Sequence, residues 1–201
     1  MEPQHLMEQP IVISPPSYVE RLNTNISFPR VQSLEVELGA GDGSFLINWA
    51  GLNPTSNFIG VERLLGRLKK IEKKARRVGL TNVRGVRLEI SYFTEYMLPP
   101  GSVNVFHIYF PDPWPKLRHR HHRLINERFA NVLRDALAPG GKVYLRTDDL
   151  DYFAQMRSVF GANANFVEME TPEALASVIT DFEREFNARG IPTNRAAYRL
   201  A

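Results

Sequence analysis

Hydrophobic positions along this chain alternate between short continuous runs and longer stretches with helical spacing. The continuous runs predict seven strands, which are SLEVEL (33–38), NFIGVE (57–62), NVRGVRL (82–88), VNVFHIYF (103–110), KVYLRT (142–147), NFVEME (165–170) and AAYRLA (196–201), the last at a sheet edge. Helical spacing predicts helices at about 44–51, 61–78, 122–137 and 149–160. Alternation of this kind predicts an α/β fold, a doubly wound, mostly parallel seven-stranded sheet with helices on both faces.

The first 33 residues follow a different pattern. Pro10, Pro15, Pro16 and Pro29 interrupt any long helix. We therefore expect residues 1–33 to form a lead-in segment, with one short helix near Tyr18–Leu22. Residues 34–201 are expected to form a single domain.

Composition narrows the class of protein. The chain has 201 residues, of which 43% are hydrophobic, but no apolar run approaches the roughly 20 residues of a membrane span. No basic segment followed by an apolar stretch begins the chain, so we expect no secretory signal and no membrane partner. The sequence contains no cysteine, which excludes disulfides and indicates a cytoplasmic protein. Composition leaves a monomer and a homodimer equally open.

A glycine-rich loop follows the first strand. The segment ELGAGDGSF places Gly39, Gly41 and Gly43 between a strand and a helix, where glycine lets the backbone turn tightly and approach a ligand. Ser44 occupies the position of the third glycine in a dinucleotide fingerprint, so the loop departs from the NAD pattern. The alternative interpretation is a tight turn without a ligand.

Three carboxylates accompany the ends of the first three strands. Glu37 precedes the glycines and could hold an ammonium group, Glu62 could accept two ribose hydroxyls, and Glu89 could reach an adenine edge. Together they suit S-adenosylmethionine, which carries all three groups. The alternative is that these acids are simply solvated.

The segment FPDPWPKLRHRHHRL (110–124) indicates the substrate. Asp112 lies between two prolines that restrict the backbone, and Trp114 offers a flat apolar face beside it, a combination suited to guanine. Lysine, arginine and histidine then fill seven of the eight positions 116–123, as expected for phosphate contacts. A rigid turn followed by a solvated helix start is the alternative. No metal site is expected, and His107 is interpreted as a core residue.

Five segments together carry a family resemblance. ELGAGDG, GVER, FPDPWPKLRHRHHR, LRTDD and TDFE occur in the order found in the bacterial tRNA (guanine-N7)-methyltransferases, and the chain resembles that family from about Leu34 to Phe186. The proline-rich turn with its basic run is the specific part, whereas many methyltransferases share the glycine loop. The resemblance implies a class I methyltransferase (Rossmann-like) fold that uses S-adenosyl-L-methionine to methylate N7 of a guanine in the variable loop (position 46) of tRNA.

The resemblance also implies residue roles. Asp112 is implied as the catalytic residue and, with Glu37, Glu62 and Glu89, as a cofactor contact. Substrate contacts are implied for Lys116, Asp148, Thr180, Asp181, Phe182 and Glu183, and RNA contacts for Arg118, His119, Arg120, His121, His122 and Arg123. Two departures stand out. Glu89 occurs where aspartate is usual, and His121 and His122 replace more common lysine or arginine, so the charge of the run should depend on pH.

The sequence leaves three other functions open. A methyltransferase for another nitrogen substrate would share the glycine loop but would not need the basic run. An NAD-dependent oxidoreductase would need the missing third glycine. A non-catalytic RNA-binding protein could keep the same fold without the chemistry.

Overall fold

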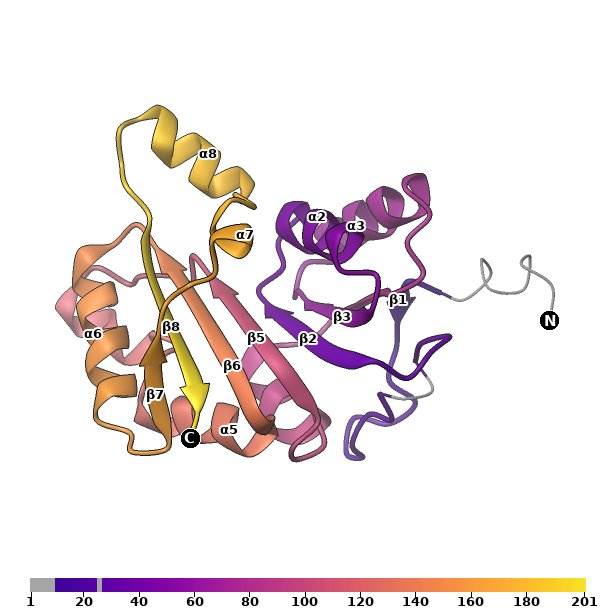
Figure 1. The fold of residues 1–201 in the computed structure, drawn as a ribbon, viewed down its shortest axis with the longest axis horizontal. Coiled ribbons are helices and arrows are strands. Elements are labelled where there is room, and N and C mark those ends of the chain that lie inside the picture. Colours follow the sequence, from indigo (N-terminus) through magenta and orange to yellow (C-terminus); the bar gives the residue numbers. More distant parts are fainter. Residues whose placement is uncertain (1–9, 25–26) are drawn as a thin grey trace. The chain divides into compact units, whose positions relative to one another are not determined.

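The computed structural model describes residues 10–24 and 27–201, which fall into two compact units divided after Pro99 (Figure 1). The first nine residues of the predicted lead-in lie outside the described residues. The predicted division into a lead-in (1–33) and a single domain (34–201) stays a prediction.

Four parallel strands form the sheet of the first unit, in the spatial order β1-β4-β3-β2. They are β1 (Val12–Ile13), β2 (Ser33–Leu38), β3 (Ser56–Val61) and β4 (Val83–Val86). Most residues of β2, β3 and β4 are buried, as expected of strands covered on both faces, and these three strands confirm the prediction.

β1 was not predicted, because two residues are too few to show a hydrophobic pattern. It lies in the lead-in segment, where a helix was predicted near Tyr18–Leu22. That prediction is wrong, since residues 18–22 form bends and irregular chain. The backbone N–H of Leu22 donates instead to the carbonyl oxygen of Met97 at 2.7 Å, which ties the segment to the rest of its unit.

The helices of the first unit are α2 (Ser44–Leu52), α3 (Leu65–Arg77), α4 (Ile90–Tyr92) and the single π-helical turn η1 (Phe93–Met97). α2 and α3 confirm the prediction. Leu68, Ile71 and Ala75, spaced to share one face of α3, are fully buried against Phe58 and Val83. α4 and η1 are too short for periodicity to reveal.

The second unit has a mixed sheet in the order β5-β6-β8-β7, in which β5 and β6 are parallel and β8 is antiparallel to both of its neighbours. Its strands are β5 (Val103–Tyr109), β6 (Leu137–Thr147), β7 (Phe166–Met169) and β8 (Asn194–Leu200). The prediction that the last strand lies at the edge is wrong. β8 pairs on both sides and β7 takes the outer position, an order that local sequence does not encode.

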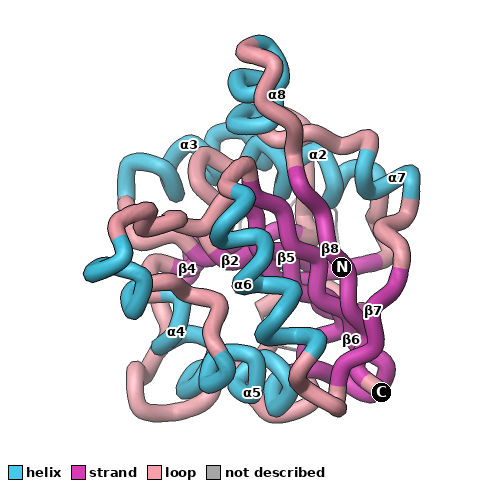
Figure 2. The backbone as a smooth tube through the Cα atoms, turned by 90° about the vertical axis from the view of Figure 1, so that its left-hand side faces the viewer, coloured by secondary structure: helices cyan, strands magenta, loops and turns pink. Residues whose placement is uncertain are grey.

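The second unit contains the short 3₁₀ helix η2 (Leu117–His122) and the helices α5 (Glu127–Ala136), α6 (Leu150–Gly161), α7 (Glu173–Ala176) and α8 (Asp181–Ala188). α6 lies along one face of the strands of this unit (Figure 2). The helix predicted from position 122 begins later, because the side chain of Asn126 caps α5 by accepting from the N–H of Phe129 at 3.0 Å. The basic run therefore lies in η2, outside the long helix.

The start of β6 also differs from the prediction. The strand predicted at 142–147 begins earlier, since the segment APGG (138–141) belongs to β6, and the pairing of β6 with β5 shifts register between Val103 and Val105. Gly140 has a φ of 69°, a left-handed conformation that glycine adopts readily and that is common at bulges. Within the described residues no helix is long and apolar enough to cross a membrane.

Candidate functional site

The register of the first unit brings the three predicted cofactor carboxylates to one edge of its sheet. Leu38, Val61 and Val86 pair across β2, β3 and β4, so they lie level with one another. Glu37 precedes that level by one residue, Glu62 follows it by one and Glu89 by three. In parallel α/β sheets, ligands bind outside the carboxyl ends of the strands. The three acids are thus grouped at the edge where a ligand is expected.

The glycine loop joins β2 to α2 at this edge. Gly39, Gly41 and Gly43 have φ angles of 87°, 55° and 78°, in the left-handed region that favours glycine. A Cβ atom on Gly43 would lie 2.6 Å from Cγ1 of Ile71 on α3, whereas one on Gly41 would meet nothing within 4 Å. The loop therefore packs against α3 at Gly43 and leaves open space at Gly41, which fits a ligand close to the backbone.

Glu37 and Glu62 are both buried at this edge. An oxygen of the Glu62 carboxylate accepts from the N–H of Leu64 at 2.8 Å, and the other lies 3.4 Å from the guanidinium of Arg67. These contacts hold the carboxylate of Glu62 in one orientation. A buried, oriented carboxylate is the group that recognition of a ribose diol needs.

Glu89 has a different environment. Its side chain is exposed and caps α4, accepting from the N–H groups of Ser91 at 3.0 Å and Tyr92 at 2.8 Å. Both oxygens have a structural role before any ligand arrives. Contact of Glu89 with an adenine therefore stays a prediction, and the capping contacts do not test it.

Asp42 is a loop residue that the sequence reasoning did not single out. One of its carboxylate oxygens accepts from the N–H of Ser44, and the other pairs with the ammonium of Lys74 on α3 at 2.7 Å. Burial raises the pKa of Asp42, but the hydrogen bond and charge of Lys74, the N–H of Ser44 and the charge of Lys70 together outweigh it, so the pKa lies below its usual value. The ion pair links α3 to the glycine loop.

In the second unit the Pro-Asp-Pro turn follows β5 directly. Phe110 and Trp114 flank it with φ angles of 51° and 42°, which are costly for aromatic residues, of order 1–3 kcal/mol each. Asp112 is exposed between them and makes no hydrogen bond or ion pair with any residue in 10–24 or 27–201. The turn thus holds a solvent-facing carboxylate on a strained, stiff backbone.

Trp114 is 38% exposed, and its ring lies among imidazoles of η2. Its centroid lies 4.9 Å from that of His122 and 6.0 Å from that of His119, while His121 and His122 are 3.9 Å apart. The predicted RNA-binding run therefore folds back onto the turn.

The cations of the basic run differ in their exposure and in whether they form ion pairs within the protein. Lys116 and Arg118 are exposed, and Arg120 is partly exposed and pairs with Asp151 at 2.8 Å. Lys116 and Arg118 form no ion pair within the described part of the chain. They are the members best placed to meet a phosphate.

Arg123 is the exception, with a side chain only 1% exposed. Its guanidinium donates to the carbonyl oxygen of Pro113 at 2.7 Å, to Gln155 at 2.8 Å and to Asp151 at 2.6 Å. It also lies 4.8 Å from the ring centroid of Tyr152. These contacts hold the proline turn against α6.

The two arginines change the pKa of Asp151. The hydrogen bond from Arg123 outweighs desolvation and, with the charges of Arg120 and Arg123, lowers the pKa of the Asp151 carboxyl. Asp151 was not predicted as a site residue, because its ion pairs join segments about 30 positions apart.

Asp148 and the segment Thr180–Glu183 complete the predicted substrate residues. Tyr109 pairs with Arg146 across β5 and β6, so Asp112 and Asp148 follow neighbouring strand ends. Asp148 is partly buried and makes no hydrogen bond or ion pair among the described residues. Asp181 pairs with Arg184 at 2.5 Å, and the 48%-exposed Phe182 packs on Phe110 with ring centroids 6.1 Å apart. The turn and α8 are therefore in contact.

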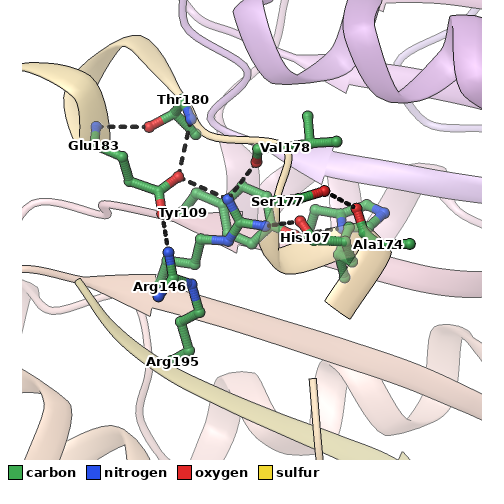
Figure 3. A network of polar contacts seen from close by, with 10 residues as sticks. His107, Tyr109, Arg146, Ala174, Ser177, Val178, Thr180, Glu183 and Arg195 are labelled. Atoms are coloured by element: carbon green, nitrogen blue, oxygen red, sulfur yellow. Dashed lines mark hydrogen bonds and ion pairs between the residues drawn. The ribbon is translucent and has the colours of Figure 1, made fainter. Parts of the chain in front are cut away.

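Thr180 and Glu183 form the capping box of α8 and are buried (Figure 3). The hydroxyl of Thr180 accepts from the N–H of Glu183 at 3.0 Å, and the carboxylate of Glu183 accepts from the N–H of Thr180 at 2.9 Å. The same carboxylate pairs with Arg146 at 2.7 Å and with Arg195 at 2.8 Å. These two predicted substrate residues are thus engaged in anchoring α8.

Arg146 connects that anchor to the sheet. Its guanidinium also donates to the carbonyl oxygens of Val178 at 2.8 Å and Leu175 at 2.7 Å, and lies 4.2 Å from the ring centroid of Tyr109 (Figure 3). Sequence reasoning missed Arg146, although an arginine within a buried strand is an unusual enough feature to have indicated it. In the part of the chain that the structure describes, no group of three or more potential ligand side chains could hold a metal ion.

The sequence is similar to known methyltransferases. Residues 31–199 match the family model described as "Putative methyltransferase". The chain is 35% identical over 173 residues to the tRNA (guanine-N(7)-)-methyltransferase of Geobacter metallireducens, covering 83% of this chain and 82% of that protein. It is 30% identical over 172 residues to the tRNA (guanine-N(7)-)-methyltransferase of Streptococcus thermophilus, covering 83% of this chain and 78% of that protein.

Among solved structures, the 16S rRNA methyltransferase KamB has a TM-score of 0.62 at 16% identity, covering 90% of this chain and 95% of that one. At this identity the likeness concerns the fold alone. It confirms the predicted α/β methyltransferase fold, to which β1 adds an eighth, short strand.

Proposed function

The chain belongs to the tRNA (guanine-N7)-methyltransferase family, and from that premise we propose that it transfers a methyl group from S-adenosylmethionine to N7 of a guanine in the variable loop of tRNA. The observation that carries the proposal is the strained Pro-Asp-Pro turn, which presents the exposed carboxylate of Asp112 beside Trp114 and the basic run. tRNA is the proposed partner and the cytoplasm the proposed compartment. Monomer or homodimer stays a prediction.

The residues of the first unit fit S-adenosylmethionine. Gly41 leaves space for a ligand against the loop backbone, and the buried carboxylates of Glu37 and Glu62 suit an ammonium group and a ribose diol. The N-terminus of α2 adds N–H groups that have no partner within the helix. Gly39, Gly43 and Glu89 complete the proposed contacts, together with Asp112. The bound cofactor would supply an electrophilic methyl group on a positively charged sulfur.

N7 of guanine carries a lone pair and no proton, so the reaction needs no general base. The protein must position N7 at about 3 Å from the methyl carbon, in line with the bond that breaks. Positive charge develops on the guanine as the bond forms. A fixed carboxylate nearby stabilises that charge, and we assign this role, with orientation of the base, to Asp112.

The basic run would hold the RNA around the target base. Lys116, Arg118 and Arg120, with His119, His121 and His122, would contact phosphates and supply affinity without sequence information. Asp148 and the exposed pair Asp181 and Phe182 would contact the substrate near the turn.

The test is transfer of labelled methyl from S-adenosylmethionine to unmodified tRNA, followed by digestion to nucleosides. We expect the label in 7-methylguanosine. Replacing the carboxylate in Asp112→Asn should lower turnover on the order of 100-fold, because a charge-stabilising group aimed at the transition state is lost.

Asp135→Asn is the matched control, since Asp135 is an exposed carboxylate on α5 whose partner is its neighbour Arg134. It should leave turnover unchanged. Label in another nucleoside would refute the guanine-N7 assignment, and full turnover by Asp112→Asn at unchanged tRNA affinity would refute the role of Asp112.

A further inference from the structure

The segment that contains α3 carries a large excess of positive charge. Residues 63–77 contain eight lysines and arginines and one acid, Glu72, so the segment carries a net charge of +7. The whole chain carries only +3. The remaining residues therefore sum to −4, so the chain without this segment would be acidic.

The charges form a stripe opposite the buried face of the helix. Leu68, Ile71 and Ala75 point into the core. Lys69, Lys73 and Arg77 follow one another at intervals of four residues, and Lys70 lies beside them; all four are exposed. At 1.5 Å per residue the stripe from 69 to 77 is about 12 Å long, enough to face several backbone phosphates.

Neither ion pairing nor helix stability explains the stripe. Some cations of the segment have acidic partners, since Arg67 pairs with Glu62, Lys74 with Asp42 and Arg76 with Glu72. None of the four stripe residues forms an ion pair within residues 10–24 and 27–201. Like charges four residues apart destabilise a helix, and only Arg77 lies in the last turn, where the helix dipole favours a cation.

We propose that this stripe, Lys69, Lys70, Lys73 and Arg77, is a second RNA-binding surface that contacts the phosphate backbone of the tRNA. The inference rests on the proposed function in taking tRNA as the substrate. Charge complementarity with a polyanion carries it, because a dense, unpaired cationic face releases counterions from RNA when it binds. The stripe contributes affinity for tRNA and takes no part in the methyl transfer itself.

The test compares two triple variants. Lys69→Gln/Lys73→Gln/Arg77→Gln removes three charges of the stripe; Lys70 stays, because its charge also lowers the pKa of Asp42 in the glycine loop. Arg134→Gln/Arg157→Gln/Arg199→Gln removes three surface arginines of the second unit and is matched in net charge. Binding of unmodified tRNA is measured by fluorescence anisotropy from low to high potassium chloride.

We expect the stripe variant to lose at least tenfold in affinity at low salt and to lower the slope of log K against log salt by about 2 to 3, since each phosphate contact contributes roughly 0.7–0.9. The control should keep the wild-type slope. The stripe variant removes like-charge repulsion within α3, so it should unfold at the wild-type temperature or above. In methyl transfer its KM for tRNA should rise while kcat stays unchanged.

An unchanged slope in the stripe variant would overturn the proposal, and so would an equal loss in both variants, which would mean that net charge alone sets binding. Fluorescence anisotropy measures tRNA binding and does not depend on methyl transfer. A wild-type protein that binds tRNA but makes no 7-methylguanosine would therefore refute the proposed function while this comparison still decides the role of the stripe.

Discussion

At the scale of single residues, members of the basic run have opposite environments. Arg118 is exposed, while Arg123, five positions later, is buried against Pro113, Asp151, Gln155 and Tyr152. Sequence alone treats both as cations of one RNA-binding segment. The structure indicates that Arg123 acts through the turn, because its guanidinium holds the carbonyl oxygen next to Asp112.

Arg123→Lys should therefore impair turnover more than RNA affinity. A lysine cannot reproduce the three directed hydrogen bonds, so the turn carrying Asp112 shifts and kcat should fall by roughly 10- to 100-fold. The salt slope of tRNA binding should stay at the wild-type value.

Arg118→Gln provides the contrast. It should lower the salt slope by nearly 1 and leave kcat at saturating tRNA unchanged. A reduced slope in Arg123→Lys would instead mean that Arg123 contacts phosphate directly.

At the scale of elements, α8 is held to its unit through one buried carboxylate. Glu183 is fully buried and accepts from Arg146, Arg195 and the N–H of Thr180. The ring of Phe186 on α8 also packs on Phe110 at 5.7 Å between centroids. Through these contacts β6, α8 and the proline turn are coupled.

Glu183→Gln should lower the free energy of unfolding by about 3 kcal/mol, because it leaves the buried guanidinium of Arg146 without its counter-charge. Glu185→Gln is the control, since Glu185 lies on the exposed side of α8 and pairs with Arg189. It should change stability by less than about 0.5 kcal/mol. Equal effects in urea denaturation would contradict the anchoring role of Glu183.

At the scale of the whole molecule, stability depends on pH through every group whose pKa differs between the folded and unfolded states. Burial raises the pKa of Tyr152 from 10.0 to about 12, although the N–H of Ile125, which donates to its hydroxyl oxygen, opposes this. Between these two values the unfolded chain loses the phenolic proton and the folded chain keeps it. Stability is therefore retained below pH 10 and falls as the pH rises above it.

Through Tyr152 the wild type should lose about 1 kcal/mol of stability between pH 9 and pH 11. The Tyr152→Phe variant should not show this loss. At pH 8 the variant should be less stable by about 1–3 kcal/mol, because the buried N–H of Ile125 loses its acceptor. Chemical denaturation at the three pH values measures both effects. Parallel pH profiles for variant and wild type would show that Tyr152 does not contribute.

The strands β2 to β8, the two long helices of the first unit and the resemblance carried by FPDPWPKLRHRHHRL were all predictable from the sequence. Strand and helix periods are local properties, and glycines at 39, 41 and 43 or prolines around Asp112 restrict the backbone wherever they occur. The start of α5 was misplaced because a cap at Asn126 competes with a helical pattern that extends further back. The position of β8 inside its sheet was missed because strand order follows from pairings between distant segments.

The sequence by itself determined which residue types stand at the strand ends, and with them the family and the proposed chemistry. Only the tertiary structure decided which of those residues are available to a ligand. Arg123, Thr180 and Glu183 are bound by partners distant in the chain or by a helix cap, while Asp112, Lys116 and Asp148 keep their charged groups unpaired among the described residues. The physical reason is that a charge removed from water must find a partner, and that partner is set by the fold rather than by sequence neighbours.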